Sequence, residues 1–151
     1  MQVTIKATGI QNLENTLKDL QNKGSNTEPL MAELANHLYN ITKESFEKEQ
    51  TPDGISWTPI KPRKGDRSPD KILKDEGDMQ ESISAFSSQD EAGIGLNATS
   101  NGYPYPIVHQ FGSKDGTIVS RAFLPIDGNE KLYDGVSAEL EEIIEDYFKI
   151  N

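Results

Sequence analysis

The sequence predicts a single α+β domain spanning residues 1–151, with amphipathic helices near both ends around a small antiparallel β-sheet. Apolar residues recur at spacings of three and four near the N-terminus and again near the C-terminus, which is typical of helices with one buried face. Between these regions, short apolar segments are separated by turn residues, as in hairpins. A chain of 151 residues is long enough to form one domain with its own core.

The N-terminal third predicts a short strand followed by two helices. The strand is expected at Val3–Ile5, and a first helix follows with one apolar face ending before Gly24 and Ser25. That face consists of Ile10, Leu13, Leu17 and Leu20. The second helix is expected to begin at Thr27 as N-cap, with Pro29 in its first turn, and to reach about Lys48.

Residues from about 50 to 70 predict a long loop, because proline and glycine recur too often there for regular structure. Pro52-Asp53-Gly54 is typical of a tight turn, since proline presets φ and glycine accepts a positive φ. A loop of this length is expected to be mobile. Trp57 follows the turn and is expected to pin the loop to the core.

The second half of the chain predicts the sheet and the last helix. Residues 77–83 are expected to form a short helix that leads into a hairpin of strands at 84–86 and 94–96. Residues 107–111 predict a short helix closed by Gly112, and 117–119 a strand that pairs with the hairpin. The last helix has an acidic outer side and an apolar face of Leu132, Val136, Leu140, Ile143, Ile144 and Tyr147.

Composition excludes several classes of protein. The chain has no cysteine, which rules out disulfides, thiolate metal sites and cysteine nucleophiles. There is no signal peptide pattern and no apolar run near the roughly 20 residues that cross a bilayer, so we expect synthesis in a cytoplasm and no membrane contact. The net charge of −10 disfavours binding to nucleic acid.

The charge is unevenly distributed. Residues 61–74 are basic, and the C-terminal region is acidic. The basic side chains expected to contact a partner are Lys61, Arg63, Lys64, Arg67 and Lys71; Lys74 is also basic. Either these regions are two solvated faces, or the basic loop of one copy meets the acidic face of another copy or of a partner.

No catalytic, cofactor or metal motif is present. His37 is expected on the surface of a helix, and no His-Glu-x-x-His pattern accompanies it. His109 has no serine or cysteine nucleophile in a recognisable setting, so we expect it to pack or to form hydrogen bonds. The glycines do not form a phosphate-binding loop. The sequence therefore predicts no enzyme and no cofactor.

Four blocks in order resemble the phage virion morphogenesis family, the Mu-like tail-completion proteins. They are Thr51-Pro52-Asp53-Gly54-Ile55-Ser56-Trp57-Thr58-Pro59-Ile60, Ile72-Leu73-Lys74-Asp75-Glu76-Gly77-Asp78-Met79-Gln80-Glu81-Ser82-Ile83, Tyr105-Pro106-Ile107-Val108-His109-Gln110-Phe111-Gly112, and Arg121-Ala122-Phe123-Leu124-Pro125. The resemblance covers about residues 10–148. The chain departs from the family pattern at Glu76, Met79, Pro106 and Ala122, and none of these changes introduces a reactive group.

The resemblance implies a structural protein of a phage or prophage virion, located in the tail or neck and acting in tail completion or head–tail joining. Its partners would be other virion proteins and further copies of itself in a ring. The structural candidates are Trp57, Gly77, Tyr105, His109, Phe111, Gly112 and Phe123. Among these, Phe111 and Phe123 are expected to fill the core, and the glycines to occupy helix ends or positive φ.

Two alternatives from other classes remain open at this point. One is a small acidic binding module, such as a host-directed inhibitor or adaptor, which would be dispensable for particle formation. The other is a hydrolase that uses His109 and nearby carboxylates, and His109→Ala would then abolish an activity without unfolding the protein.

Overall fold

The computed structural model describes residues 3–6, 15, 18, 19, 22, 26–59, 78–96 and 105–150. Its elements are β1 (Val3–Lys6), α2 (Glu28–Lys48), α3 (Asp78–Glu81), β2 (Ser84–Ser87), β3 (Ala92–Leu96), α4 (Tyr105–Phe111) and α5 (Asp134–Ile150). Residues 15, 18, 19 and 22 are helical and exposed. The apolar face expected for the first helix lies outside the described residues.

The sheet has three antiparallel strands in the order β1-β3-β2. The opening strand and the hairpin are therefore confirmed. The expectation that residues 117–119 pair with the hairpin is wrong, because these residues form no strand and the described sheet consists of β1, β3 and β2. Instead, Ile118 accepts a hydrogen bond through its carbonyl from the Ser113 N–H, so this segment folds back on the loop after α4.

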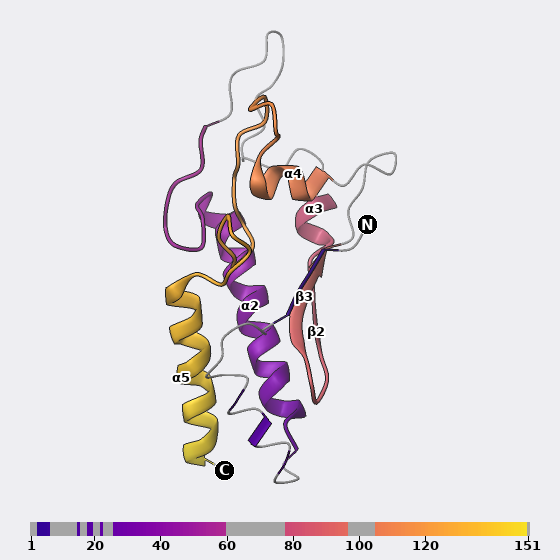
Figure 1. The fold of residues 1–151 in the computed structure, drawn as a ribbon, viewed down its shortest axis with the longest axis vertical. Coiled ribbons are helices and arrows are strands. Elements are labelled where there is room, and N and C mark those ends of the chain that lie inside the picture. Colours follow the sequence, from indigo (N-terminus) through magenta and orange to yellow (C-terminus); the bar gives the residue numbers. More distant parts are fainter. Residues whose placement is uncertain are drawn as a thin grey trace.

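Helix α2 is the central element of the fold. It contacts the hairpin of β2 and β3 as well as α5, and Figure 1 shows it between the sheet and α5. An amphipathic helix that buries two sides needs a wide apolar stripe. Its buried side chains are Leu30, Met31, Leu34, Ala35, Leu38, Thr42, Ser45 and Phe46.

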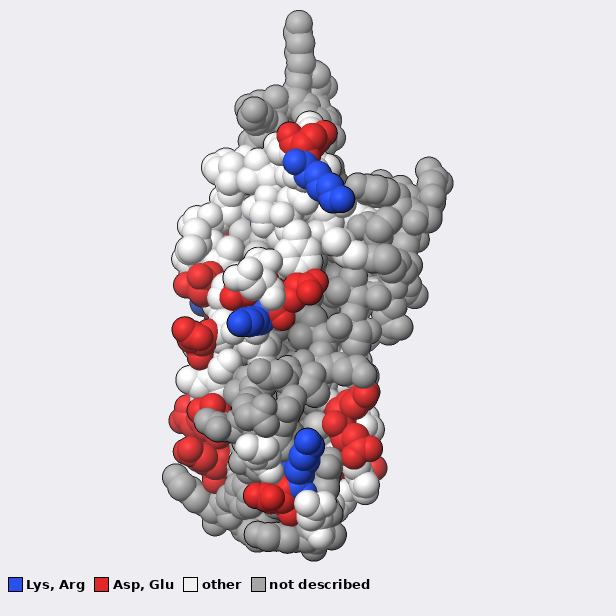
Figure 2. All heavy atoms as spheres, in the orientation of Figure 1, with Lys and Arg blue, Asp and Glu red and all other residues white. Residues whose placement is uncertain are grey.

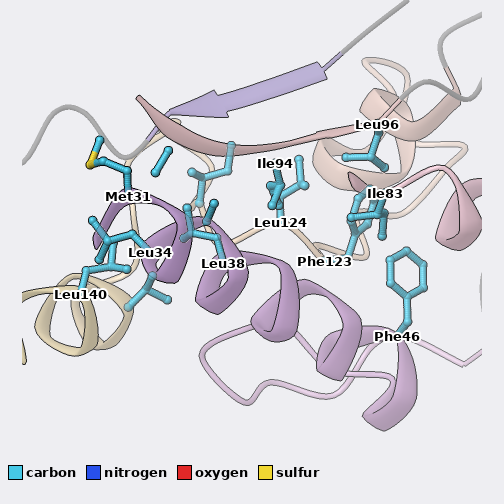
Figure 3. Close-up of a cluster of buried hydrophobic side chains, with 14 of the residues drawn as sticks. Met31, Leu34, Leu38, Phe46, Ile83, Ile94, Leu96, Phe123, Leu124 and Leu140 are labelled. Atoms are coloured by element: carbon cyan, nitrogen blue, oxygen red, sulfur yellow. The ribbon is translucent and has the colours of Figure 1, made fainter. Parts of the chain in front are cut away.

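Strand β3 is buried over its whole length. Because side chains alternate between the two faces of a strand, Ala92, Ile94 and Leu96 share one face. Figure 3 shows Ile94 and Leu96 in the same cluster as Leu38 of α2 and Phe123. The sheet is therefore joined to α2 through one continuous hydrophobic core.

The start of α2 differs from the expected cap. Thr27 holds the N-cap position, but its hydroxyl makes no capping hydrogen bond. It donates to the Gln89 carbonyl at 2.8 Å, in the turn between β2 and β3. Asn26 instead accepts through Oδ1 from the Glu28 N–H at 3.2 Å. Thr27 thus fastens the hairpin to the helix, a long-range role that local sequence does not show.

Helix α5 packs against α2 and carries the acidic outer side that the sequence predicts. Val136, Leu140 and Ile144 are buried. Leu132, expected in this helix, precedes it and pairs with Ile126 in an isolated bridge. No helix in the described part of the chain is both long enough and apolar enough to span a membrane.

Candidate interaction site

The loop after α2 begins with a closed turn. Gln50 and Ser56 form an antiparallel bridge, and the Thr51 N–H donates to the Ile55 carbonyl at 2.7 Å. Gly54 adopts a φ of +91°, the left-handed region that glycine tolerates best. The tight turn predicted at Pro52-Asp53-Gly54 is confirmed. Residues 60–77, which include Gly77 and the basic side chains, lie outside the described residues.

Trp57 anchors the end of this turn in the core. Its side chain is 4% exposed, and its ring packs edge-on against Phe46 with centroids 5.7 Å apart. The indole Nε1–H donates to the Ala122 carbonyl at 2.8 Å. Phe46 also contacts Phe123 at 5.0 Å, and Phe123 is fully buried as expected. Two of the four family-like blocks therefore meet in one aromatic cluster around Phe46.

Gln110 joins the third block to the fourth. Its side chain is 2% exposed, and Oε1 accepts from the N–H groups of Phe123 and Leu124, both at 2.9 Å. Its Nε2 donates to the Ile126 carbonyl at 3.4 Å. One side chain thereby satisfies three backbone groups of a buried segment that lies in no sheet. The sequence analysis did not identify Gln110. The only signal was its spacing of four residues from Pro106, which places both residues on the buried face of α4.

Gly112 allows the chain after α4 to turn back along residues 118–121. Its φ is +81°, and a Cβ placed there would lie 3.2 Å from the Ile118 carbonyl oxygen and from Ser120 N. The Arg121 N–H donates to the His109 carbonyl at 2.7 Å, which keeps the two segments together. A side chain at this position would strain the backbone and crowd backbone atoms that cannot easily move. The expected positive φ at Gly112 is confirmed.

Phe111 is not a core residue, contrary to expectation. Its side chain is 37% exposed. In α4 the core-facing positions are Pro106 and Gln110, and a helix turns by about 100° for each residue. Phe111 is therefore rotated away from the core. The sequence led to the wrong prediction because an aromatic residue beside a helix end is usually buried.

His109 is partly buried next to Tyr105, with ring centroids 6.2 Å apart in an edge-on arrangement. Among the described residues, its Nδ1 is buried and has no hydrogen-bond partner. Burial, and then the positive charge of Arg121, lower the pKa of His109 from its usual value of 6.5. A proton on the imidazole would be poorly solvated here, so the folded protein favours the neutral form.

The lowered pKa of His109 predicts a loss of stability in mild acid. The unfolded chain takes up this proton near pH 6.5, while the folded chain resists it until a lower pH. The free energy of unfolding should therefore fall as the pH decreases from 6.5 toward the folded pKa. Urea unfolding of wild type and His109→Gln at several pH values measures this effect.

The acid-dependent loss should be reduced in His109→Gln and retained in His37→Gln, which removes the other histidine. Carboxylates add their own pH dependence below about pH 5, so the comparison is made between variants at each pH. Equal pH dependence in wild type and His109→Gln would contradict the prediction.

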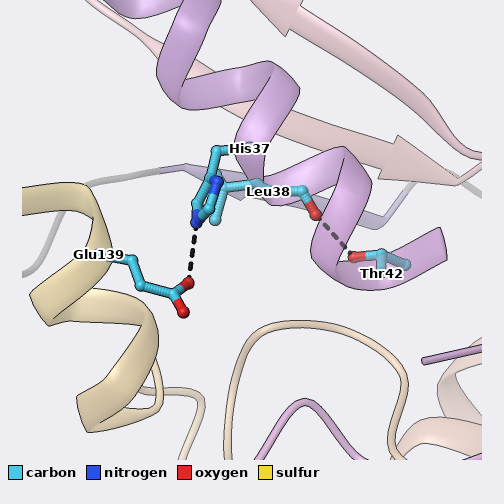
Figure 4. A network of polar contacts seen from close by, with 4 residues as sticks. All are labelled: His37, Leu38, Thr42 and Glu139. Carbon is cyan, nitrogen blue, oxygen red and sulfur yellow. Dashed lines mark hydrogen bonds and ion pairs between the residues drawn. The ribbon is translucent and has the colours of Figure 1, made fainter. Parts of the chain in front are cut away.

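A groove of about 420 Å³ lies between the C-terminal half of α2, the 50–54 turn and the start of α5. His37 Nε2 lies 2.8 Å from Glu139 Oε2 and links α2 to α5 across it (Figure 4). The His37 side chain is 31% exposed, so it is less exposed than expected and it has a partner. Burial raises the pKa of Tyr133 on the groove wall, and the charges of Asp53 and Asp127 raise it further.

The groove offers hydrogen-bonding groups but no recognisable catalytic arrangement. No group of three or more histidine, cysteine or carboxylate side chains within the described ranges is placed to hold a metal ion. The pair of His37 and Glu139 is solvent-accessible, and it connects two helices. Exposed ion pairs of this kind contribute little to stability.

Acidic side chains dominate the described surface. Figure 2 shows red patches at the edge occupied by α5 and few blue side chains on the same face. The exposed acidic residues of α5 are Asp134, Glu139, Glu142, Glu145 and Asp146. The acidic face expected from the sequence is therefore confirmed for this helix, and it is available for contact with a basic partner.

The chain is similar to known proteins over almost its whole length. The model of the phage virion morphogenesis family matches residues 8–150. The chain is also 27% identical over 153 residues to a Haemophilus influenzae protein named Mu-like prophage FluMu G protein 2, an alignment that spans 98% of this chain and 97% of that protein. No solved structure matches the chain.

Proposed function

The chain belongs to the phage virion morphogenesis family, and we therefore propose that it is a structural protein that completes the phage tail or joins the tail to the head. The observation that carries this proposal is the family match over residues 8–150. The similarity to a Mu-like prophage protein along nearly the full length of both chains supports a phage or prophage protein.

The described structure fits a protein that acts through its surface. Two of the four family-like blocks contain described residues that hold buried backbone in place. Trp57 fixes the turn after α2, Gln110 provides hydrogen bonds to the segment after Arg121, and Gly112 allows the chain to turn back after α4. Such residues make a rigid shape and supply no reactive group. In this proposal the protein works by protein–protein contact in the tail or neck and catalyses no reaction.

The proposed contacts include further copies of the chain in a closed ring. The basic segment that contains Lys61, Arg63 and Lys64 would meet an acidic surface such as the outer side of α5, in the same particle. Charges of opposite sign would orient the subunits as they approach, and salt would slow this step by screening.

Deletion of the gene from the phage or prophage that carries it tests the proposed function. We expect electron microscopy of the lysate to show separate heads and tails, or tails of abnormal length, and infectivity to return when the wild-type gene is supplied. Normal infectious particles without the gene would refute a structural role and would favour a small acidic binding module instead.

A further inference from the structure

Helices α2 and α5 lie side by side and run in opposite directions (Figure 1). Two contacts show how they are aligned. His37 Nε2 lies 2.8 Å from Glu139 Oε2, and the Tyr147 hydroxyl donates to the Asn26 carbonyl at 3.2 Å. The C-terminal half of α5 therefore lies beside the N-terminal half of α2, far from Glu49, the residue that ends α2.

The C-terminal half of α5 has an acidic surface. The whole helix contains six carboxylates and one basic residue, Lys149. Glu142, Glu145 and Asp146 are exposed, and they are named here the acidic end of α5. Figure 2 shows acidic side chains along the side of the molecule where Figure 1 places this helix. A partner that fits this surface carries positive charge.

The basic residues 61–64 begin two positions after a point where the chain is held in place. The Trp57 N–H donates to the Glu49 carbonyl at 2.8 Å, at the end of α2. The Arg121 guanidinium donates through Nη2 to the Pro59 carbonyl at 3.3 Å. Figure 1 shows the chain leaving this place beyond the C-terminal end of α2 and away from α5. The basic residues therefore start at the end of the molecule opposite to the acidic end of α5.

The rise of a helix gives the distance between these two places. Because a helix rises about 1.5 Å for each residue, Glu49 lies about 18 Å along α2 from the level of His37 and Glu139. Glu145 lies six residues further along α5 in the opposite direction, which adds about 9 Å. Measured along the helices, Glu145 is therefore about 27 Å from the level of Glu49.

Residues 61–64 cannot cover Glu145 and Asp146 of their own chain. An extended chain spans at most about 3.6 Å for each residue, so the backbone of Lys64 lies within about 18 Å of Pro59. The distance that remains to Glu145 is longer than a lysine side chain, and it is longer still for the basic residues nearer to Pro59. A contact between these opposite charges has to join two molecules.

Charge complementarity selects a second copy as the other molecule. Residues 61–64 read Lys-Pro-Arg-Lys and contain no acid, and the acidic end of α5 carries three carboxylates. Two copies with a net charge of −10 repel each other over most of their surfaces. The basic segment of one copy and the acidic end of the other are surfaces that attract, and every copy carries both.

We propose that the acidic end of α5 binds residues 61–64 of a second copy of this chain. The inference rests on the proposed role in the particle, and it names the surface and the partner segment of the self-association. In a ring, each copy gives its basic segment to one neighbour and its acidic end to the other. Arg121 acts as a positioning residue, because it holds the Pro59 carbonyl at the start of the segment.

Sedimentation velocity of the full chain at low salt and several concentrations tests the proposal. Glu145→Lys/Asp146→Lys reverses two charges of the acidic end and changes the net charge from −10 to −6. Glu81→Lys/Glu130→Lys makes the same change at exposed positions outside α5. We expect the first variant to raise the dissociation constant at least about tenfold, because like charges then face each other. The second should not raise it, since it only reduces the general repulsion.

A charge exchange tests the pairing itself. Lys61→Glu/Arg63→Glu should weaken self-association as the reversal of the acidic end does. The variant with all four substitutions, at Lys61, Arg63, Glu145 and Asp146, keeps the net charge of −10 and should recover most of the lost affinity, because opposite charges face each other again. Glu145→Lys/Asp146→Lys should keep the wild-type melting temperature, since lysine near the C-terminal end of a helix is favourable.

Three results would overturn the inference: a wild-type chain that stays monomeric at every concentration, wild-type affinity in Glu145→Lys/Asp146→Lys, or no recovery in the variant with four substitutions. Equal weakening in Glu81→Lys/Glu130→Lys would also overturn it, because the effect would then not belong to α5. None of these results bears on the proposed role in the particle, which the gene deletion tests separately.

Discussion

Replacing Trp57 with alanine is expected to lower the free energy of unfolding by about 3–5 kcal/mol, the usual range for truncating a large buried aromatic residue. The indole is 4% exposed and packs edge-on against Phe46. Its removal would leave a cavity beside Phe46 and would also take away the donor to the Ala122 carbonyl. Urea unfolding followed by far-ultraviolet circular dichroism measures the effect, since Trp57 is the only tryptophan and its fluorescence is lost in the variant.

Two controls separate packing from hydrogen bonding. Trp57→Phe keeps most of the apolar ring and loses the Nε1 donor, so we expect a cost of about 1–2 kcal/mol. Ile55→Ala, two residues earlier at 64% exposure, should change stability by less than about 0.5 kcal/mol. A cost below about 1.5 kcal/mol for Trp57→Ala would show that the turn is not held by this side chain.

The elements predicted well are those whose pattern repeats locally. Helix α2 begins and ends almost where its apolar period and Pro29 place it, because a wide buried stripe on 21 residues leaves a strong signal. The hairpin of β2 and β3 follows from two short segments on either side of a turn. Helix α5 is equally clear, apart from Leu132, which pairs with Ile126 before the helix starts.

The errors concern contacts between segments that are distant in sequence. Residues 117–119 have the composition of a strand, yet the Ile118 carbonyl accepts from the Ser113 N–H and the segment joins no sheet. Thr27 has the right chemistry for a cap, yet its hydroxyl reaches Gln89, 62 residues away. Local propensity cannot decide between such partners, because the outcome depends on which other segment is nearer in the folded chain.

The candidate site is predicted only in part, because local sequence does not show which distant segments come together. Trp57 and Phe123 were identified because large aromatics tend to be buried, and Gly112 because it follows a short helix. Phe111 was misplaced because a helix of seven residues gives too few turns to fix which side is buried.

Gln110→Ala is expected to destabilise the protein by about 2–5 kcal/mol, although the change removes a polar side chain from the core. The reason is the set of groups left behind: the N–H groups of Phe123 and Leu124 lose their acceptor, and the Ile126 carbonyl loses its donor. Each buried polar group without a partner costs about 1–3 kcal/mol. The midpoint of urea unfolding should fall without a change in slope.

Asn36→Ala is the matched control, because it removes an amide side chain from an exposed position of α2. It should be nearly neutral, since alanine favours a helix more than asparagine does. Gln110→Met fills most of the same volume without restoring the acceptor for Phe123 and Leu124, so it should remain strongly destabilised. If Gln110→Met were as stable as wild type, the role of Gln110 would be to fill space. If it were as unstable as Gln110→Ala, the cost would come from the unpaired backbone, and the segment after Arg121 would depend on this one amide in place of a strand partner.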